Sequence, residues 1–170
     1  RYMKLGYLEY SVCPCLAYDL TKELPVAAVP ENMHIERLPM EGEAVNRFIA
    51  VTREANNGTP DSAAELWFMS GEPSFGNFVL LDGDQIVSSA STWRITDDRA
   101  AIENIVTAPA YQKRGCGKAL IAYTLANIKE QGYKQATLSM RGTNLRAHHL
   151  YHGLGFELLF NQIELLYPAK

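Results

Sequence analysis

The segment YQKRGCGKAL, residues 111–120, places two glycines at the start of an apolar run. The spacing of the apolar residues after Gly115 predicts a helix from Gly115 to Gln131. The backbone N–H groups in the first turn of a helix have no partner inside that helix. No Ser, Thr, Asp or Asn stands just before this one to cap them. The stretch therefore predicts a helix start whose donors are available to an acceptor from outside the helix.

An anion is the acceptor that such a helix start favours. Its N–H groups and the helix dipole attract negative charge, and glycines let a ligand approach the backbone closely. Lys113, Arg114 and Lys118 add positive charge to the same loop. The loop thus predicts a phosphate or pyrophosphate site, with simple hydration of an exposed helix start as the alternative.

Two well-known phosphate motifs do not fit this loop. A Walker A loop needs G-x-x-x-x-G-K-[ST], but Gln112 takes the place of its first glycine and Ala119 that of its Ser or Thr. A Rossmann loop needs a third glycine where Leu120 stands, and its strand opens a βαβ unit. The strand before this loop belongs instead to a predicted antiparallel meander.

That meander covers residues 75–107, where three alternating strands are joined by tight turns at DGD and TDDR. Upstream of it, Met33–Leu38 predicts a strand and Glu43–Ala55 predicts a helix. A second helix is expected to start at Asp61 or Ser62 and to carry Leu66, Trp67 and Met69.

Downstream of the loop, Gln135–Met140 predicts a strand, and Asn144 can cap a following helix. The chain is then expected to close with a hairpin around Asn161 and Gln162.

The first 23 residues form a separate question of domain organisation. YMKLGY (2–7) resembles YHGLGF (151–156) in pattern, and each precedes two short apolar runs. Two interpretations stay open: coincidence, or residues 1–23 as the C-terminal remnant of a preceding similar repeat, with 24–32 a linker and 33–168 the main domain. The repeat hypothesis predicts a hairpin joined at Pro14, whose open edge would pair with the domain, with another copy or with an upstream unit.

Composition excludes several classes of partner. The chain has 170 residues, 47% of them hydrophobic and 21% charged, as in ordinary globular domains. Its net charge of −3 gives no general attraction to nucleic acid or to an anionic membrane. Its three cysteines match neither a disulfide framework nor a zinc pattern, which favours a reducing cytoplasm.

Two motifs together carry a family resemblance. The first is Q-x-x-G-x-G at Gln112, Gly115 and Gly117, after the strand that ends in VTAP. The second is N-x-x-A-x-x-L-Y-x-x-L-G-F, from Asn144 to Phe156. With their order and spacing, the sequence resembles the GNAT superfamily of acyl-CoA N-acyltransferases. The resemblance implies an α+β fold with a central mixed, mostly antiparallel twisted sheet flanked by helices.

The resemblance also implies acetyl-CoA as co-substrate, without a metal. In the family, the loop amides bind the pyrophosphate, and pantetheine enters where the strand ending at Thr107 splays from Gln135–Met140. The cofactor-binding residues expected on this basis are Ile105, Val106, Thr107, Gln112, Lys113, Arg114, Gly115, Cys116, Gly117, Lys118, Asn144 and Ala147.

Two residues are candidates for proton transfer, which acyl transfer to an amine requires. Tyr151 stands where the family often has its catalytic tyrosine, and it is the candidate acid; a core tyrosine is the alternative. Glu103 is the candidate base or the anchor of a substrate ammonium. It lies four residues before Thr107, so strand alternation predicts both on one face. The alternative is a surface glutamate paired with Arg94 or Arg99.

Two further residue types have simpler interpretations. His148 and His152 have the spacing of metal ligands, but no third ligand is marked and no H-E-x-x-H is present, so exposed histidines are expected. Cys116 is expected to fill space rather than to react.

The expected function is transfer of the acetyl group of acetyl-CoA to a primary amine, by direct attack in a ternary complex. A small-molecule acceptor is expected, in the cytoplasm, with no nucleic acid and no membrane involved. A homo-oligomer or an upstream tandem domain is the expected association. The alternatives are a catalytically inactive acyl-CoA-binding or interaction module and a peptide or protein N-acetyltransferase.

Overall fold

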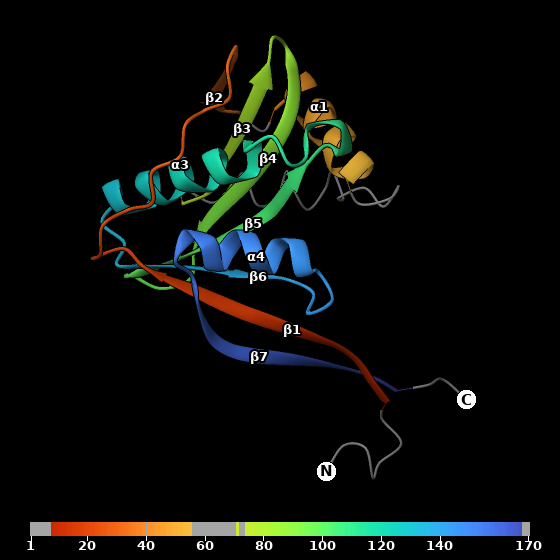
Figure 1. Ribbon diagram of the computed structural model, residues 1–170, viewed down its shortest axis with the longest axis vertical. Helices are drawn as coiled ribbons and strands as arrows, with labels where there is room; N and C mark the ends of the chain where they lie inside the picture. Colours follow the sequence, from red (N-terminus) through yellow and green to blue (C-terminus); the bar gives the residue numbers. More distant parts are fainter. Residues whose placement is uncertain (1–7, 40, 56–70, 72–73, 168–170) are drawn as a thin grey trace.

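The computed structural model describes residues 8–39, 41–55, 71 and 74–167 (Figure 1). The second helix predicted from Asp61 or Ser62 lies outside these residues. The elements are β1 (Leu8–Asp19), β2 (Met33–Arg37), α1 (Glu43–Ala55), β3 (Gly76–Asp82), β4 (Gln85–Arg94), β5 (Arg99–Thr107), the short 3-10 helix η2 (Pro109–Tyr111), α3 (Cys116–Glu130), β6 (Gln135–Ser139), α4 (Leu145–Leu154) and β7 (Glu157–Leu166).

The described strands form one sheet in the order β2-β3-β4-β5-β6-β1-β7. Strands β2 to β5 pair antiparallel in sequence order, so the predicted meander is confirmed. Gly83 takes the tight turn between β3 and β4 with φ 56°, a left-handed conformation that glycine adopts without strain. The fold is the predicted α+β architecture with a mixed, mostly antiparallel sheet.

Strands β5 and β6 are parallel, and their pairing is short. It covers Arg99↔Gln135, Ala100↔Ala136 and Ala101↔Thr137, and then it ends. Both strands continue beyond this point without pairing to each other, which confirms the predicted splay. The opening lies at the carboxyl ends of the two strands, where parallel α/β units place their ligands.

The two predicted hairpins at the ends of the chain are wrong. Residues 8–19 form a single strand, β1, and residues 157–166 form another, β7. β1 lies between β6 and β7 and is antiparallel to both. The two expected turns face each other, because Pro14 is the register partner of Asn161. Long-range pairing along the whole of both segments therefore prevails over the local turn preference of Pro and Asn.

Proline at this point does not interrupt the pairing on the other side. The Pro14 carbonyl accepts a hydrogen bond of 3.2 Å from the Met140 amide, and the Val12 carbonyl accepts one of 2.8 Å from the Gly142 amide. Pro14 lacks only a donor, and β1 pairs in register with β6 from Cys15 onward. The backbone N–H that Pro14 lacks would therefore stand at the position where the hydrogen-bonded pairing of β1 with β6 begins.

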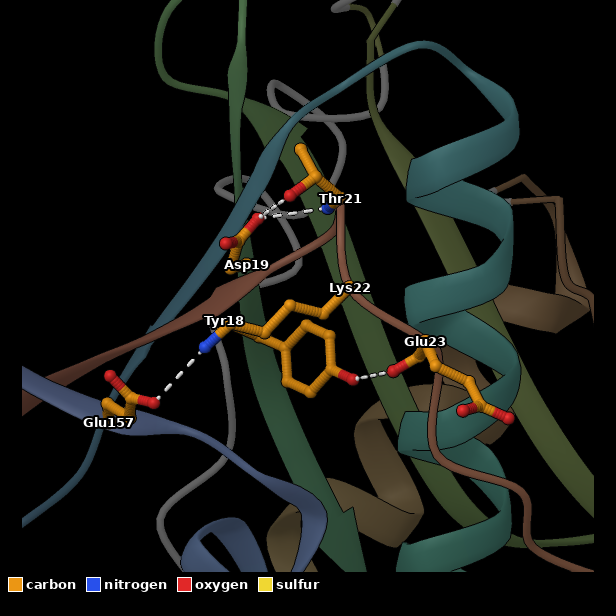
Figure 2. A network of polar contacts seen from close by, with 6 residues as sticks. All are labelled: Tyr18, Asp19, Thr21, Lys22, Glu23 and Glu157. Carbon is orange, nitrogen blue, oxygen red and sulfur yellow. Dashed lines mark hydrogen bonds and ion pairs between the residues drawn. The ribbon is translucent and has the colours of Figure 1, made fainter.

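The end of β1 belongs to the main core. Leu16 and Leu20 are each 1% exposed and pack in the same cluster as α3 and α4. Figure 2 shows the polar contacts that follow: Asp19 accepts from the Thr21 amide and hydroxyl at 2.9 and 2.7 Å. Lys22 reaches Glu157 on β7 at 3.3 Å. Residues 8–23 thus supply an interior strand of the sheet, next to the edge strand β7, and part of the core.

The helices cover both faces of the sheet. α3 contributes Leu120, Ile121 and Leu125 to the cluster that contains Phe78 and Ala90. α1 contributes Phe48 and Val51 to the cluster on the opposite face, with Val79 and Leu81 as its members from β3. Successive side chains of a strand point to opposite faces, so neighbouring residues of β3 pack in different clusters. None of the described helices is long and apolar enough to cross a membrane.

Candidate active site

The start of α3 has no side-chain cap, as predicted. Its N-cap is Gly115, whose φ of 86° lies in the left-handed region, and no side chain accepts a hydrogen bond from the first turn. A Cβ added at Gly117 would lie 3.3 Å from Oγ1 of Thr107 and 3.6 Å from Cδ2 of Leu150. The second glycine therefore keeps the space between the loop, the end of β5 and α4 clear of side-chain atoms.

A cavity of about 360 Å³ opens at this helix start. Its walls come from the end of β5, the loop before α3 and the first turns of α4. Of the predicted cofactor-binding residues, the structure places Ile105, Val106, Thr107, Gln112, Lys113, Gly115, Cys116, Gly117, Lys118, Asn144 and Ala147 in its lining. Arg114 is not among them, because its guanidinium lies over the Tyr111 ring, 4.9 Å from the centroid.

A second cavity, of about 280 Å³, lies at the opening between β5 and β6. Ser139 and Met140 line it from the end of β6, and Ile105 lines it from β5. It shares Ile105, Asn144, Ala147 and Tyr151 with the first cavity. The splayed strands thus allow two adjoining spaces, one beside the anion loop and one beyond Tyr151.

Hydrogen bonds fix the end of β5 beside the first cavity. Ser88 donates to the Val106 carbonyl at 2.6 Å, and its hydroxyl is 2.9 Å from that of Thr107. Gln112 donates to the Thr107 carbonyl at 3.1 Å, which ties the loop to the strand. Arg146, in the first turn of α4, donates in turn to the Gln112 side chain. Three elements are thereby held together around the cavity mouth.

Tyr151 is both a core residue and a residue of the cavity wall, as its two sequence interpretations allowed. It is 5% exposed and packs in the main core, 5.8 Å from the Phe156 ring. It also lines both cavities, and no described residue makes a hydrogen bond with its hydroxyl. Burial raises the pKa of Tyr151 to about 12, which keeps the phenol protonated at neutral pH. A buried, protonated tyrosine in the wall of a cavity is able to donate the proton of its hydroxyl.

Glu103 lies on the other face of the sheet from Thr107, so the alternation argument is wrong here. Thr107 pairs with Ser88 and Glu103 with Ser91; β4 advances three residues between these pairs and β5 advances four. The extra residue is a β-bulge, which reverses the alternation. Asn104, inside the bulge, has a left-handed φ of 50°. The sequence alone gives no signal for this insertion.

The environment of Glu103 still suits a base. Burial raises its pKa above the ordinary value for a glutamate, and no opposite charge counteracts this. Arg94 forms an ion pair with Asp97 at 3.6 Å, and no ion pair joins Glu103 to a described residue. The surface ion pair proposed as its alternative role is therefore not found in this part of the chain. Glu103 lines neither of the two cavities.

Cys116 and Asn144 take the simpler roles that the sequence suggested for them. Cys116 is buried against Leu80 and Val87, and burial raises the pKa of its thiol. Asn144 caps α4, accepting from the Ala147 amide at 3.1 Å, and it also lines the cavities. Among the described residues, no group of three or more His, Cys, Asp or Glu side chains could hold a metal ion.

Three residues of the cavity wall are not among those predicted from the sequence: Tyr111, Arg146 and Leu150. Arg146 was detectable in principle, because it follows the Asn144 cap by two residues and adds a cation at the first turn of a helix. Its direction toward Gln112 depends on how α4 packs beside the loop, which the sequence does not state.

Comparisons with known proteins find acetyltransferases. A model described as the Acetyltransferase (GNAT) family matches residues 43–156. A curated relative, the [ribosomal protein bS18]-alanine N-acetyltransferase of Escherichia coli (strain K12), is 32% identical over 80 residues, which is 47% of this chain and 53% of that protein. The chain thus matches about half the length of that relative.

Solved structures show the same arrangement of elements. A GCN5-related N-acetyltransferase from Sphaerobacter thermophilus has a TM-score of 0.79 at 18% identity, covering 99% of this chain and 56% of that one. The ribosomal-protein-S18-alanine N-acetyltransferase from Escherichia coli has a TM-score of 0.65 at 26% identity, covering 74% and 77% of the two chains.

Proposed function

The chain belongs to the GNAT acetyltransferase family, and we propose that it transfers the acetyl group of acetyl-CoA to a primary amine. The observation that carries this proposal is the uncapped start of α3, which opens on a cavity between splayed strands. Such a start attracts an anion, and Gly117 leaves room for the ligand's close approach. The site therefore fits a ligand with a pyrophosphate at one end and a narrow chain at the other.

The residues around the cavity account for binding. The amides of Gly115, Cys116 and Gly117 and the charges of Lys113 and Lys118 would hold the pyrophosphate of coenzyme A. Beyond Thr107, the narrow arm of the ligand would follow the end of β5 into the opening beside β6. When bound, the thioester supplies an acyl carbon that is already activated for attack.

Two side chains would handle the protons of the transfer. Glu103, with its raised pKa, would accept a proton from the acceptor ammonium, directly or through water. Tyr151, protonated at neutral pH, would donate one toward the departing sulfur. The amine would attack the thioester directly, in a complex that holds both substrates. Because Glu103 and Thr107 face opposite sides of the sheet, the acceptor would approach from the α1 face.

The acceptor that we propose is a small-molecule primary amine. A peptide N-terminus is the second candidate, because the curated relatives are alanine N-acetyltransferases of a ribosomal protein. Both acceptors present an amine to the same groups, so they differ in what lies beyond it. An inactive acyl-CoA-binding module remains the rival from another class, and it would keep the loop while Glu103 and Tyr151 contribute nothing.

We further propose that the protein works in the cytoplasm, without nucleic acid or membrane partners. For segment 1–23 we retain the proposal of a strand left from a preceding GNAT-like repeat, in a homo-oligomer or a tandem arrangement. β1 lies between β6 and the edge strand β7, a place that is compatible with either origin.

Release of free thiol from acetyl-CoA across a panel of acceptors tests the proposed function. The panel combines small primary amines with short peptides that begin with alanine. Amine-dependent release with a small amine supports the first acceptor class, and release with the peptides alone supports the second. Acetyl-CoA binding by calorimetry, with no release for any acceptor, would support the inactive module instead.

A further inference from the structure

A row of buried hydroxyl groups on β4 faces the bulge of β5. Ser88, Ser89 and Ser91 are all 0% exposed. A central strand covered on both faces normally carries apolar side chains, and a buried hydroxyl is unfavourable unless it is hydrogen-bonded. Each of these serines does donate a hydrogen bond: Ser88 and Ser89 donate to carbonyls of β5, and Ser91 donates to Asn77 on β3.

The bonds of Ser89 and Ser91 concentrate on the bulged residue. Ser89 donates to the Asn104 carbonyl at 3.2 Å. The Asn104 amide group donates to the Ser91 hydroxyl at 3.5 Å, and Ser91 donates onward to Oδ1 of Asn77 on β3 at 3.0 Å. Asn104 is thus held by its backbone and by its side chain, across three strands.

Two members of the row, Ser89 and Ser91, share one face of the sheet with Glu103, whereas Ser88 faces the other side with Thr107. Ser91 is the register partner of both Asn77 and Glu103, and cross-strand partners project to the same side. Its neighbour Ala90 packs in the α3-side core, so Ser91 projects to the side of α1. Glu103 therefore stands directly beside the hydrogen-bonded row.

The bulge has a second consequence, on the cofactor side. Ile105, Val106 and Thr107 follow it and line the first cavity. Without the extra residue, these three positions would present their opposite faces to the cavity, because strand alternation has a period of two. One inserted residue therefore determines both the face on which the candidate base Glu103 lies and which side chains of β5 line the cavity.

We propose that Ser89 and Ser91 are positioning residues that act through Asn104: they fix the bulge and so set where Glu103 and the cavity-lining end of β5 stand. This proposal rests on the proposed acetyl transfer. In this proposal β4 supplies no proton-transfer group, but its serines determine where the reacting groups on β5 are placed.

Three variants test it: Ser91→Ala, Asn104→Gly and the double variant. Glycine tolerates the φ of 50° at position 104, so Asn104→Gly removes the amide group and keeps the backbone conformation accessible. Thr92→Val is the matched control. It removes a buried hydroxyl from the same strand, whose one hydrogen bond to a described residue goes to the Gly76 carbonyl at 3.5 Å, away from the bulge.

With the best acceptor of the panel, Ser91→Ala and Asn104→Gly are each expected to lower kcat by about tenfold or more, since small misplacements are costly to catalysis. Acetyl-CoA affinity by calorimetry should fall less than kcat, because the anion loop of α3 is untouched and only the end of β5 in the cavity wall is displaced. The double variant should lose little more than the worse single one, because both substitutions break one chain of contacts. Thr92→Val should keep wild-type kcat.

A purely structural role predicts different results. It would lower the melting temperature without changing kcat of the folded variants, or it would give additive losses in the double variant. Either outcome overturns the proposal, and so does an equal loss of kcat in Thr92→Val.

A second measurement separates this proposal from the proposed function. If the wild type releases no thiol with any acceptor, the proposed function fails, whereas hydrogen–deuterium exchange of peptides covering 100–108 still tests the bulge. Faster exchange there in Ser91→Ala than in Thr92→Val is expected. Unchanged exchange would show that the serines do not hold the bulge.

Discussion

Glu103 and Thr107 face opposite sides of the same strand, although four positions separate them. The pairing of Thr107 with Ser88 and of Glu103 with Ser91 leaves one unmatched residue in β5. Thr107 is consequently next to Gly117 and the start of α3, while Glu103 is on the α1 face. The sheet thereby separates the anion loop from the candidate base, and the bulge is the point at which the alternation of β5 reverses.

The glycine of the anion loop gives the first prediction. Gly117→Val should weaken acetyl-CoA binding, because its Cβ would already lie 3.3 Å from Oγ1 of Thr107 and two methyl groups would add to it. Calorimetric titration of the folded variant measures the loss. Lys129→Ala, at the distant end of α3, is the control. An affinity equal to wild type would remove the loop as the pyrophosphate site.

The hydroxyl of Tyr151 gives the second prediction. Tyr151→Phe keeps the ring contact with Phe156 and nearly all of the buried area, so the melting temperature should change little. General acid catalysis contributes about 10²–10⁴-fold, and the low end of that range or less is expected, because a thiolate is a tolerable leaving group. The loss should appear in kcat, with acetyl-CoA affinity retained. Wild-type turnover would leave Tyr151 as a core residue only.

The titration of Glu103 gives the third prediction, on activity. As the base, Glu103 must be ionised, so kcat/KM should fall as the pH decreases through its raised pKa. Glu103→Gln should lower kcat/KM and abolish this acidic limb. The pH profiles of both proteins, with the same acceptor, provide the measurement. An acidic limb that persists in the variant would assign it to another group.

The same carboxyl gives a fourth prediction, on stability. Its pKa is higher in the folded state than in the unfolded chain, so the folded state binds this proton more tightly. Its contribution to stability is therefore complete below the ordinary glutamate value of about 4.3 and is lost as the pH rises through the raised pKa. Glu103→Gln should melt higher than wild type at neutral pH, and the difference should shrink in acid. A difference independent of pH would contradict the assignment.

Strand β1, which lies between β6 and the edge strand β7, gives the fifth prediction. Leu16 is 1% exposed in the main core, so Leu16→Ala should cost about 2–5 kcal/mol of unfolding free energy. Val12, on the same strand, is 36% exposed, and Val12→Ala should cost about 0.5 kcal/mol. Denaturant unfolding of both variants makes the comparison. Equal costs would mean that β1 does not belong to the folded core.

Local sequence determined those parts of the protein whose physical cause is local. Alternation over 75–107 defined the three central strands, and the glycines with no preceding cap predicted the start of α3 and its unmet donors. The Asn144 cap and the left-handed glycine at Gly155 bracket α4 in the same way. Each of these features depends on backbone preferences within a few residues, so a single sequence carries them.

Only the tertiary structure decided the features that depend on partners distant in the chain. Pro14 and Asn161 both favour turns, yet each lies within an extended strand because the two segments pair along their length. The bulge at Asn104 is hydrogen-bonded by buried hydroxyls of β4, a partner that lies distant in the chain. It changes the face on which Glu103 lies, and a count of residues along one strand does not contain it. The raised pKa values of Glu103 and Tyr151 have the same origin, since burial is created by packing and not by neighbours in sequence.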